Sequence, residues 1–539
     1  MFILSSLLYV GGLGFYSDDW SSLATWTSCP DPSYEGLVKC FYRAEGDASI
    51  RPLQILYQTG LYRLFGRRPF GQHALNSSLI ACTLLLLYLA LRKFGVNRML
   101  AMAISLVYGL MPHYSTDRFW IAAGQSNVCM AFCFLSFYSA ARILAPDAKY
   151  RWAWTLTSVL AMLASLLAYE VSAPLMVLVP VLLYVGFRRS TELSPFPASQ
   201  KRTPRLVLLF SLASLTLFVF LKVTLQTRLG FHGKFLHQLG LVLRHAVSQS
   251  LSFNIGRYGL ALPVAAWRAV RGHPDTHVVA FAALAGVAIF VNCFRIACRS
   301  RQALPTCGGW IGLMLLGLVC YGLGFALFAA DPNLDFVSTG VENRLTIAAS
   351  VGTAIWLVGL FGWASSFLPG PRLRAAASTA LVALYCASGF AINDTIASYW
   401  IEARHRQEEA LAEIHKTFAT LPSGTTLLVG GVCRYVGPGI VFEGEWDMAG
   451  ALQILYRDPT LRGNVLNPRL RLQPDSVILP IYTEEKAYFY SDRLILYDAV
   501  QKRTFRLTSL EAARDAIRSA AFLEAGCPPG LEGKGAPTF

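Results

Sequence analysis

The sequence predicts a mainly α-helical fold: a polytopic transmembrane helical bundle, followed by a small external α+β domain. Two observations predict the bundle. Hydrophobic residues make up 54% of the 539 residues and charged residues only 15%, with a mean hydropathy of +0.45, which is not the composition of a soluble domain. Apolar runs of membrane-crossing length also recur over most of the chain. The α+β domain is predicted by a change of pattern after Trp400.

Eleven apolar stretches predict membrane spans. The first is shorter than the ~20 residues that a helix needs to cross a bilayer, which predicts either a short first span or residues missing before Met1. The run 255–270 is a further candidate span or re-entrant segment, so the predicted total is 11 to 13. The stretches lie at residues 1–16, 75–92, 99–112, 119–141, 152–169, 171–187, 206–224, 277–294, 308–330, 345–367 and 375–392.

Charge predicts which loops face the cytoplasm. The net charge is +15, but Lys and Arg stand in short clusters between apolar runs, which favours membrane lipids over nucleic acid as partners. Every second loop is basic, and these five loops hold 16 basic residues against only Asp147 and Glu192. We therefore expect them inside, and the loops 17–74 and 225–276 and the C-terminal tail outside. The expected location is a bacterial inner membrane with the tail in the periplasm.

The predicted domains are a transmembrane catalytic domain at 1–394 and an external α+β domain at 395–539. In the first, residues 52–65 and 235–253 have apolar positions at helical spacing and predict helices lying in the interface, which either seal the bundle or grip a lipid-linked substrate. The second begins with a charged helical pattern at 402–417, followed by strands near 425–431, 476–479, 487–490, 493–497 and 504–507. An oxidising compartment would pair Cys29 with Cys40 and Cys433 with Cys527.

Polar residues gather on the predicted external side. Asp18 and Asp19 follow the first apolar run, and we predict one of them as a general base. The other candidates are predicted to bind substrate: Arg51, His113, Asp117, Gln125, Glu170, Lys222, Arg257, Tyr258 and Arg344. Carboxylates beside guanidinium groups suit displacement of a phosphate-linked group, because a carboxylate can accept the proton of an attacking hydroxyl while Arg stabilises the departing phosphate. A structural role competes at four places: the Asp18–Asp19 pair as a plain interfacial boundary, Glu170 as a helix cap, Arg344 as an interfacial anchor and His113 as an interfacial residue.

Five short motifs in this order resemble those of the integral-membrane glycosyltransferases of C-type fold (GT-C) that use polyprenyl-phosphate sugars. They are Tyr16-Ser-Asp-Asp-Trp20, Arg51-Pro-Leu53, Trp120-Ile-Ala-Ala-Gly-Gln-Ser126, Tyr169-Glu-Val-Ser-Ala-Pro174 and Glu342-Asn-Arg-Leu345. The resemblance covers residues 1 to about 400. It implies direct, inverting transfer at the external face, with a first-loop acid as base and basic residues on the donor phosphate. Related enzymes often carry Lys where Tyr169 stands here.

The predicted function is transfer of a sugar from a polyprenyl-phosphate carrier to a glycan, lipid or protein acceptor. No cofactor is required by this prediction, and a divalent metal at His113, Asp117 and the Asp pair is left open. The rival is a non-catalytic transporter or flippase of lipid-linked saccharides. Transporters tend to show internal repeats and ionisable groups at mid-span depth, whereas here the acids cluster at one face and no repeat is found. A third class, a structural assembly partner that binds through its tail, predicts that the Asp pair tolerates substitution.

Overall fold

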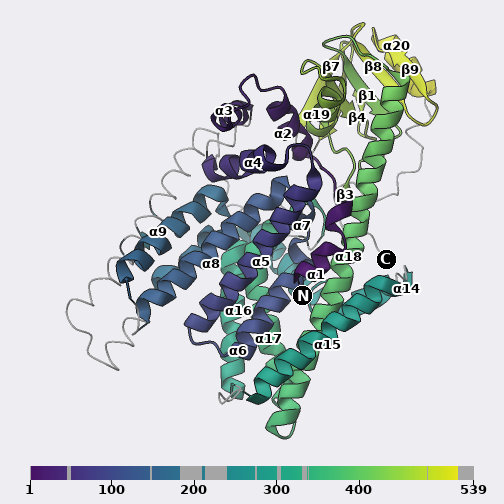
Figure 1. Cartoon of the computed structure of the whole chain (residues 1–539). Helices are drawn as coiled ribbons and strands as arrows, with labels where there is room; N and C mark the ends of the chain where they lie inside the picture. The colour runs from purple at the N-terminus through teal and green to yellow at the C-terminus, as the bar shows by residue number, and fades with distance from the viewer. Residues whose placement is uncertain are drawn as a thin grey trace.

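The computed structural model describes residues 2–44, 50–145, 149–181, 239–272, 276–299, 305–329, 339–481 and 484–519, with isolated positions at 209, 211, 212, 216 and 337. Figure 1 shows a bundle of long helices with a sheet-containing domain at one end. The helices α2 (Asp18–Thr27), α3 (Tyr34–Ala44) and α4 (Pro52–Phe65) cap the bundle at that same end. The predicted fold class, a polytopic helical bundle with a small α+β region, is confirmed.

Within the described residues, seven helices are long and apolar enough to cross a membrane, which makes the chain a multi-pass membrane protein. The predicted stretches 1–16 and 99–112 form shorter apolar helices there. The stretch 171–187 does so as far as residue 181, where the described residues end, and 206–224 lies almost wholly outside them. The seven are α5 (Pro69–Lys93), α8 (Gln125–Leu144), α9 (Arg151–Ala168), α15 (Thr276–Arg299), α16 (Cys307–Ala329), α17 (Ile347–Ser365) and α18 (Pro371–Thr417).

Small residues let α16 and α17 approach closely. A Cβ added at Gly352 would lie 2.1 Å from the backbone nitrogen of Tyr321, and one added at Gly324 would lie 2.4 Å from that of Ala349. Such contacts are typical of membrane helices, whose association depends on close backbone packing because lipid is as apolar as their side chains. The pair therefore forms a tightly packed unit in the bundle.

The remaining bundle helices are shorter. Asn97 caps α6 (Arg98–Leu110), its side chain accepting a hydrogen bond from the Leu100 amide at 2.8 Å. The predicted interfacial segment 52–65 forms α4, and that at 235–253 is described from residue 239 as α13 (Leu239–Ile255). The candidate span 255–270 instead contains a turn and the start of α14 (Leu262–Gly272).

The cap formed by α2, α3 and α4 has its own small core. Trp26 of α2 stacks on Phe41 of α3 and Tyr62 of α4, with ring centroids 4.9 and 5.1 Å apart. The predicted disulfide between Cys29 and Cys40 joins α2 to α3. Cys433 is also disulfide-bonded, and its predicted partner Cys527 lies outside the described residues.

Helix α18 runs for 47 residues from the bundle into the C-terminal domain, so the predicted boundary at residue 394 falls within one helix. The main sheet has the order β4 (Arg462–Val465), β1 (Thr426–Gly430), β8 (Leu494–Asp498) and β9 (Arg503–Arg506). Strand β1 pairs in parallel with both β4 and β8, while β8 and β9 form the predicted hairpin.

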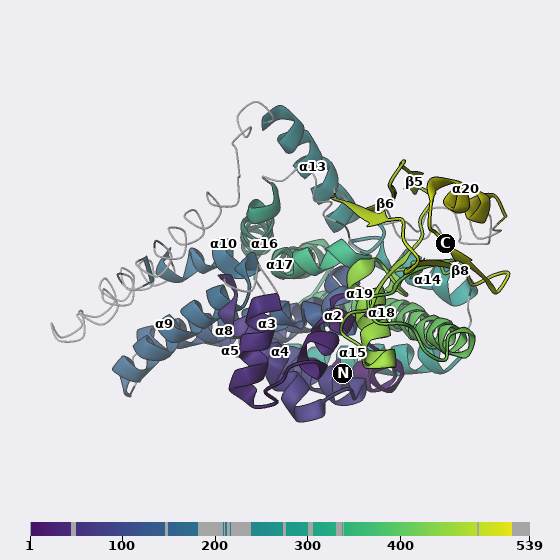
Figure 2. The same cartoon turned by 90° about the horizontal axis from the view of Figure 1, so that it is seen from above.

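A helix, a second sheet, a short ribbon and a last helix complete this domain. Helix α19 (Glu445–Tyr456) connects β1 to β4 and packs on α2, as Figure 2 shows from above. A second sheet contains β5 (Arg471–Leu472), β6 (Ser476–Ile481) and β7 (Glu484–Phe489), all antiparallel, and β2 (Tyr435–Val436) and β3 (Gly439–Ile440) form a short ribbon against α18. Helix α20 (Leu510–Ser519) packs behind β9.

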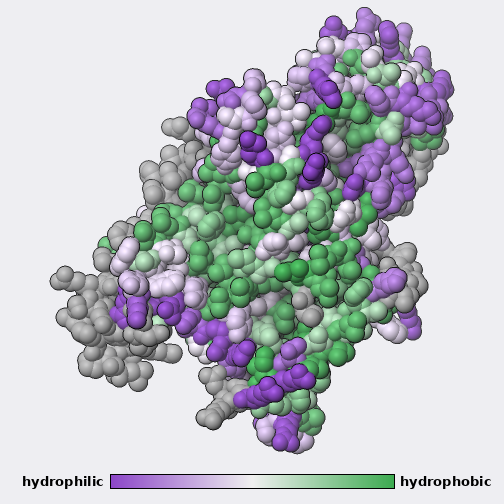
Figure 3. All heavy atoms as spheres, in the orientation of Figure 1, coloured by the Kyte–Doolittle hydropathy of each residue, from purple (hydrophilic) through white to green (hydrophobic). Residues whose placement is uncertain are grey.

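The surface matches this arrangement. Figure 3 shows hydrophobic residues over the bundle, while hydrophilic residues gather on the C-terminal domain and around α2 to α4, and again at the opposite end. An apolar belt between two polar ends is the surface expected of a chain that spans a bilayer.

Candidate functional site

The two predicted acids begin α2, directly after a sharp turn at Ser17. Ser17 has a φ of 46°, a left-handed value that is unfavourable for a residue with a side chain. Tyr16 holds the turn against α18, because its hydroxyl donates a hydrogen bond to the Trp400 carbonyl at 2.7 Å. The acids therefore lie where the first apolar segment, α2 and α18 meet.

The two carboxylates differ in environment. Asp19 is buried, and its oxygens accept hydrogen bonds from the backbone amides of Tyr16 at 2.9 Å and Ala122 at 2.7 Å. Burial raises the pKa of Asp19 to about 8, although the amides of Tyr16 and Ala122 oppose the rise. Asp18, one residue earlier, is partly exposed. Asp19 thus ties α2 to the segment at Ala122, whereas Asp18 has access to solvent.

The segment that Asp19 contacts is a chain of short turns between α6 and α8: η3 (Pro112–Tyr114), α7 (Thr116–Phe119) and η4 (Ala122–Gly124). Asn76 and Asn127 hold it, both donating to the backbone carbonyl of Asp117, at 2.9 and 2.7 Å. These paired amides bind the turn to α5 and α8. They fix the position of Asp117 itself.

The Asp117 carboxylate is fully buried. Burial raises the pKa of Asp117 well above its ordinary value, and Ser126, Arg344 and Arg118 lie close enough to oppose that rise. Arg344 belongs to η8 (Val341–Thr346), where its guanidinium lies 4.9 Å from the centre of the Trp120 ring. The predicted residues Asp117 and Arg344, 227 positions apart in the chain, are thus neighbours.

Arg51 and Glu170 are also brought together. The Arg51 guanidinium donates from Nε to Glu170 Oε2 at 3.0 Å and from Nη2 to Oε1, a bidentate pair. It also lies 4.6 Å from the centre of the Tyr169 ring. The pair connects the start of α4 to η5 (Glu170–Ser172), the turn that follows α9.

Tyr169 joins these two groups of residues. Its phenol is buried, which raises its pKa, and the charges of Arg344, Arg51, Glu170 and Asp117 all act on it. The charges of four predicted residues therefore act on one tyrosine, and one of the four, Arg51, lies against its ring. Asp19 is connected to them through Ala122, two residues after the Trp120 ring that Arg344 covers.

The remaining predicted residues lie elsewhere in the fold. His113 is fully buried, with Nε2 2.9 Å from the Phe253 carbonyl, and burial lowers its pKa to about 4. Gln125 is buried at the first residue of α8. Arg257 lies 5.6 Å from the centre of the Tyr258 ring, and the Tyr258 carbonyl accepts from Tyr385 of α18. Lys222 lies outside the described residues.

A divalent metal would need a cluster of hard oxygen ligands. In the described parts of the chain, no group of three or more His, Cys, Asp and Glu side chains is placed to hold a metal ion. The structure thus adds no support to a metal at His113, Asp117 and the acid pair.

A second set of polar contacts, which the sequence did not single out, connects the acid turn to the C-terminal domain. Ser17 Oγ donates to Glu443 Oε2 at 2.8 Å and accepts from the indole nitrogen of Trp446 at 2.9 Å. Tyr435 donates to the other Glu443 oxygen at 2.7 Å. The run from Glu443 to Asp447, three acids around a tryptophan, was the available signal.

Comparison with known proteins gives structural matches only. No family model and no curated protein matches the chain. Solved structures of ArnT from Cupriavidus metallidurans do match: one bound to undecaprenyl phosphate, at 15% identity over 87% of this chain and 85% of that one, and one in the apo state, at 17% over 86% and 84%.

Both of these alignments have a TM-score of 0.33. At this TM-score the matches do not place single residues of the chain on residues of ArnT.

Proposed function

We propose that the chain is an integral-membrane glycosyltransferase that moves a sugar from a polyprenyl-phosphate donor to an acceptor hydroxyl at the non-cytoplasmic face, with inversion. One observation supports this most: the bidentate Arg51–Glu170 pair lies against Tyr169, the charges of Arg344 and Asp117 also act on this tyrosine, and the turn that carries Trp120 and Ala122 links Arg344 to Asp19 of α2. A bacterial inner membrane, with this end of the bundle in the periplasm, is part of the proposal.

Asp18 is the general base of the proposed reaction. The acceptor oxygen attacks the anomeric carbon as its proton passes to the Asp18 carboxylate, and the bond between the anomeric carbon and the phosphate oxygen breaks. The electron pair of that bond leaves with the polyprenyl phosphate. Asp19 acts as a positioning residue, because both of its oxygens already accept backbone hydrogen bonds.

Arg344 is the residue proposed to contact the donor phosphate. Negative charge builds on the phosphate as it departs, and a guanidinium fixed in place stabilises that charge without reorganising. The Trp120 ring supports the Arg344 guanidinium from one side. Arg51 is committed to Glu170 by two hydrogen bonds, so its proposed role is to hold α4 and η5 together beside Tyr169.

The base is tested by transfer from radiolabelled polyprenyl phosphosugars, using undecaprenyl carriers first, to a membrane extract of the source cells. We expect Asp18→Asn to lower the transfer rate by roughly 100-fold or more while donor binding is retained. Asp492→Asn, the same change at an exposed position of the C-terminal domain, is the matched control. Full activity of Asp18→Asn would refute the assignment of the base.

The phosphate contact is tested by donor binding. Arg344→Ala should weaken binding of the polyprenyl phosphate, whereas Arg372→Ala, an exposed arginine at the start of α18, should not. Unchanged donor affinity in a folded Arg344→Ala protein would count against this role. Transbilayer movement of the lipid-linked sugar without any transfer product would instead favour the rival transporter.

A further inference from the structure

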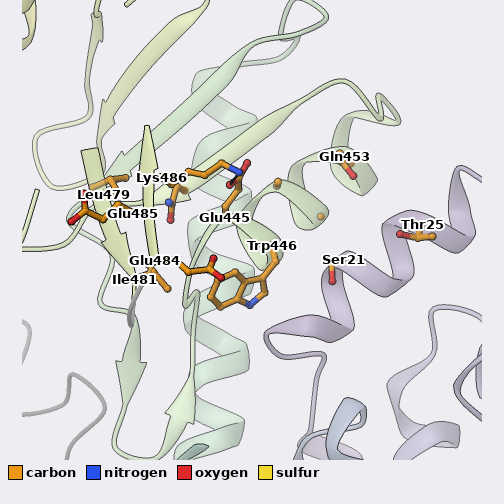
Figure 4. Close-up of a pocket in the computed structure, with 13 residues that line it drawn as sticks. Ser21, Thr25, Glu445, Trp446, Gln453, Leu479, Ile481, Glu484, Glu485 and Lys486 are labelled. Carbon is orange, nitrogen blue, oxygen red and sulfur yellow. Dashed lines mark ion pairs between the residues drawn. The ribbon is translucent and has the colours of Figure 1, made fainter. Parts of the chain in front are cut away.

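A cleft lies between the membrane cap and the C-terminal domain. Its volume is about 410 Å³, and its walls come from α2, α19, β4, β6 and β7. Figure 4 shows the Trp446 ring in this cleft, between Ser21 on α2 and Glu484 on β7. Pockets of 300 to 1,000 Å³ are of the size that holds small ligands, so the cleft can accommodate one or two sugar rings.

The cleft combines one fixed aromatic ring with several polar groups. Trp446 is half-buried, and its indole nitrogen is held by Ser17, so the ring has a defined orientation. Gln453 and Thr25 add amide and hydroxyl groups on facing helices. An aromatic platform with a few polar groups around it suits a ligand that has one apolar face and many hydroxyls, which describes a pyranose ring.

The charged side chains that line the cleft restrict which ligands it can bind. Three glutamates and one lysine line the cleft: Glu445 pairs with Lys486 at 2.8 Å, and Glu485 pairs with Arg471 outside it. Glu484 is exposed and forms no ion pair within the part of the chain that the structure describes. Its carboxylate is available to accept hydroxyl or ammonium donors, whereas an anionic group would be repelled.

The cleft is also close to the acid turn. Ser21, which lines it, lies three residues after Asp18 on α2 and donates to the Asp18 carbonyl at 3.0 Å. Trp446 contacts Ser17, the residue just before Asp18. A ligand in the cleft therefore lies beside the turn that carries the proposed base.

From these contacts we infer that the cleft is the acceptor subsite, and that it binds a neutral or amine-bearing saccharide with Trp446 as the stacking platform and Glu484 as a hydrogen-bond acceptor. The assignment of the saccharide as acceptor rests on the proposed glycosyl transfer; the binding itself does not. A phosphate-bearing or carboxylate-bearing sugar would bind more weakly, because Glu484 repels it.

Saturation-transfer NMR on the purified full-length protein tests this without any donor. The probes are maltotriose, cellotriose and chitotriose, with glucose 6-phosphate against glucose as the charge test. We expect saturation of the pyranose protons for at least one trisaccharide, several-fold loss in Trp446→Ala and Glu484→Gln, and a weaker signal for glucose 6-phosphate than for glucose.

Two further variants distinguish loss of the stacking ring from a general disturbance of the fold. Trp446→Phe keeps a stacking ring but loses the indole donor to Ser17, and it should retain most of the saturation. Phe489→Ala removes an exposed ring on the same strand as Glu484 and should leave the signal unchanged. No signal from any trisaccharide, or equal signals in wild type and Trp446→Ala, would overturn the inference.

The outcomes for the cleft and for the transferase are distinguishable. If saccharides bind in a Trp446-dependent way to a protein that never transfers sugar, the cleft is a saccharide site and the proposed transferase function is refuted. The alternative outcome is that the protein transfers sugar from the donor while Trp446→Ala and Glu484→Gln leave the acceptor concentration for half-maximal rate unchanged. That result would refute the cleft as the acceptor subsite but not the transferase.

Discussion

The crossing of α19 over α2 depends on the absence of a side chain at Gly450. A Cβ there would lie 2.5 Å from the Trp20 carbonyl oxygen and 2.8 Å from the Ser21 nitrogen, both backbone atoms that cannot rotate away. Carbon-to-oxygen contacts are normally about 3.3 Å or longer. Gly450→Ala must therefore push the two helices apart by roughly 0.8 Å.

This displacement has a predictable effect on the acid turn. The hydrogen bond from Trp446 to Ser17 is 2.9 Å long, and a shift of that size would take it beyond hydrogen-bonding distance. Overpacking costs roughly 1–3 kcal/mol, partly offset by the ~1 kcal/mol that alanine gains over glycine in a helix. We expect a modest loss of stability and a larger loss of transfer rate, roughly 10- to 100-fold, because the proposed base moves relative to its substrate.

The assay combines hydrogen exchange over residues 18–27 with the transfer rate of the purified protein. Gly60→Ala is the matched control, since Gly60 lies within α4 with nothing within 4 Å of an added Cβ, and it should be neutral or slightly stabilising. If Gly450→Ala gave the same exchange and the same rate as Gly60→Ala, the close contact would have no functional importance.

Two more predictions concern charge. Burial raises the pKa of Asp447 to about 7 and that of Asp19 to about 8. Buried His113, with a pKa of about 4, opposes their effect only below about pH 6.5, where it would be protonated in the unfolded chain. From about pH 7 to 8 the folded protein therefore binds more protons than the unfolded chain and its stability should fall as pH rises; thermal unfolding across this range checks it, and a rise in stability would contradict it. The bidentate Arg51–Glu170 pair, with both side chains about a fifth exposed, should show a coupling free energy of about 0.5–3 kcal/mol in a double-mutant cycle of Arg51→Lys and Glu170→Gln, and purely additive effects would show that the pair contributes no coupling.

Much of the fold could be predicted because hydrophobic patterning is a local signal. The seven long apolar helices all fall on predicted stretches, and the strand β1 and the hairpin of β8 and β9 follow from short apolar runs and a turn at Asp498. The parallel pairing of β1 with β4 could not be predicted this way, because it depends on the crossover through α19, whose 12 residues were not recognised as a helix.

The site was predictable in part for a different reason. Sidedness predicted Arg51, Glu170, Asp117 and Arg344 at one membrane face, and in the structure Arg51 pairs with Glu170 while the charges of all four act on Tyr169. The proposed roles of Asp18 as base and Asp19 as positioning residue depend on which backbone amides lie within hydrogen-bonding distance after folding. No local pattern carries that information, since the Ala122 amide is 103 residues away in the chain.

Helix α18 is a long, continuous helix that carries the C-terminal domain beyond the bundle. Its 47 residues span about 70 Å as one rod, more than twice the ~30 Å thickness of the hydrocarbon layer. The height of the cleft above the lipid is thereby set by a fixed length of helix rather than by a linker. Under the proposed transfer, an acceptor anchored in the same bilayer would be a substrate only if it extends to that height, so the length of α18 would select acceptors by their length.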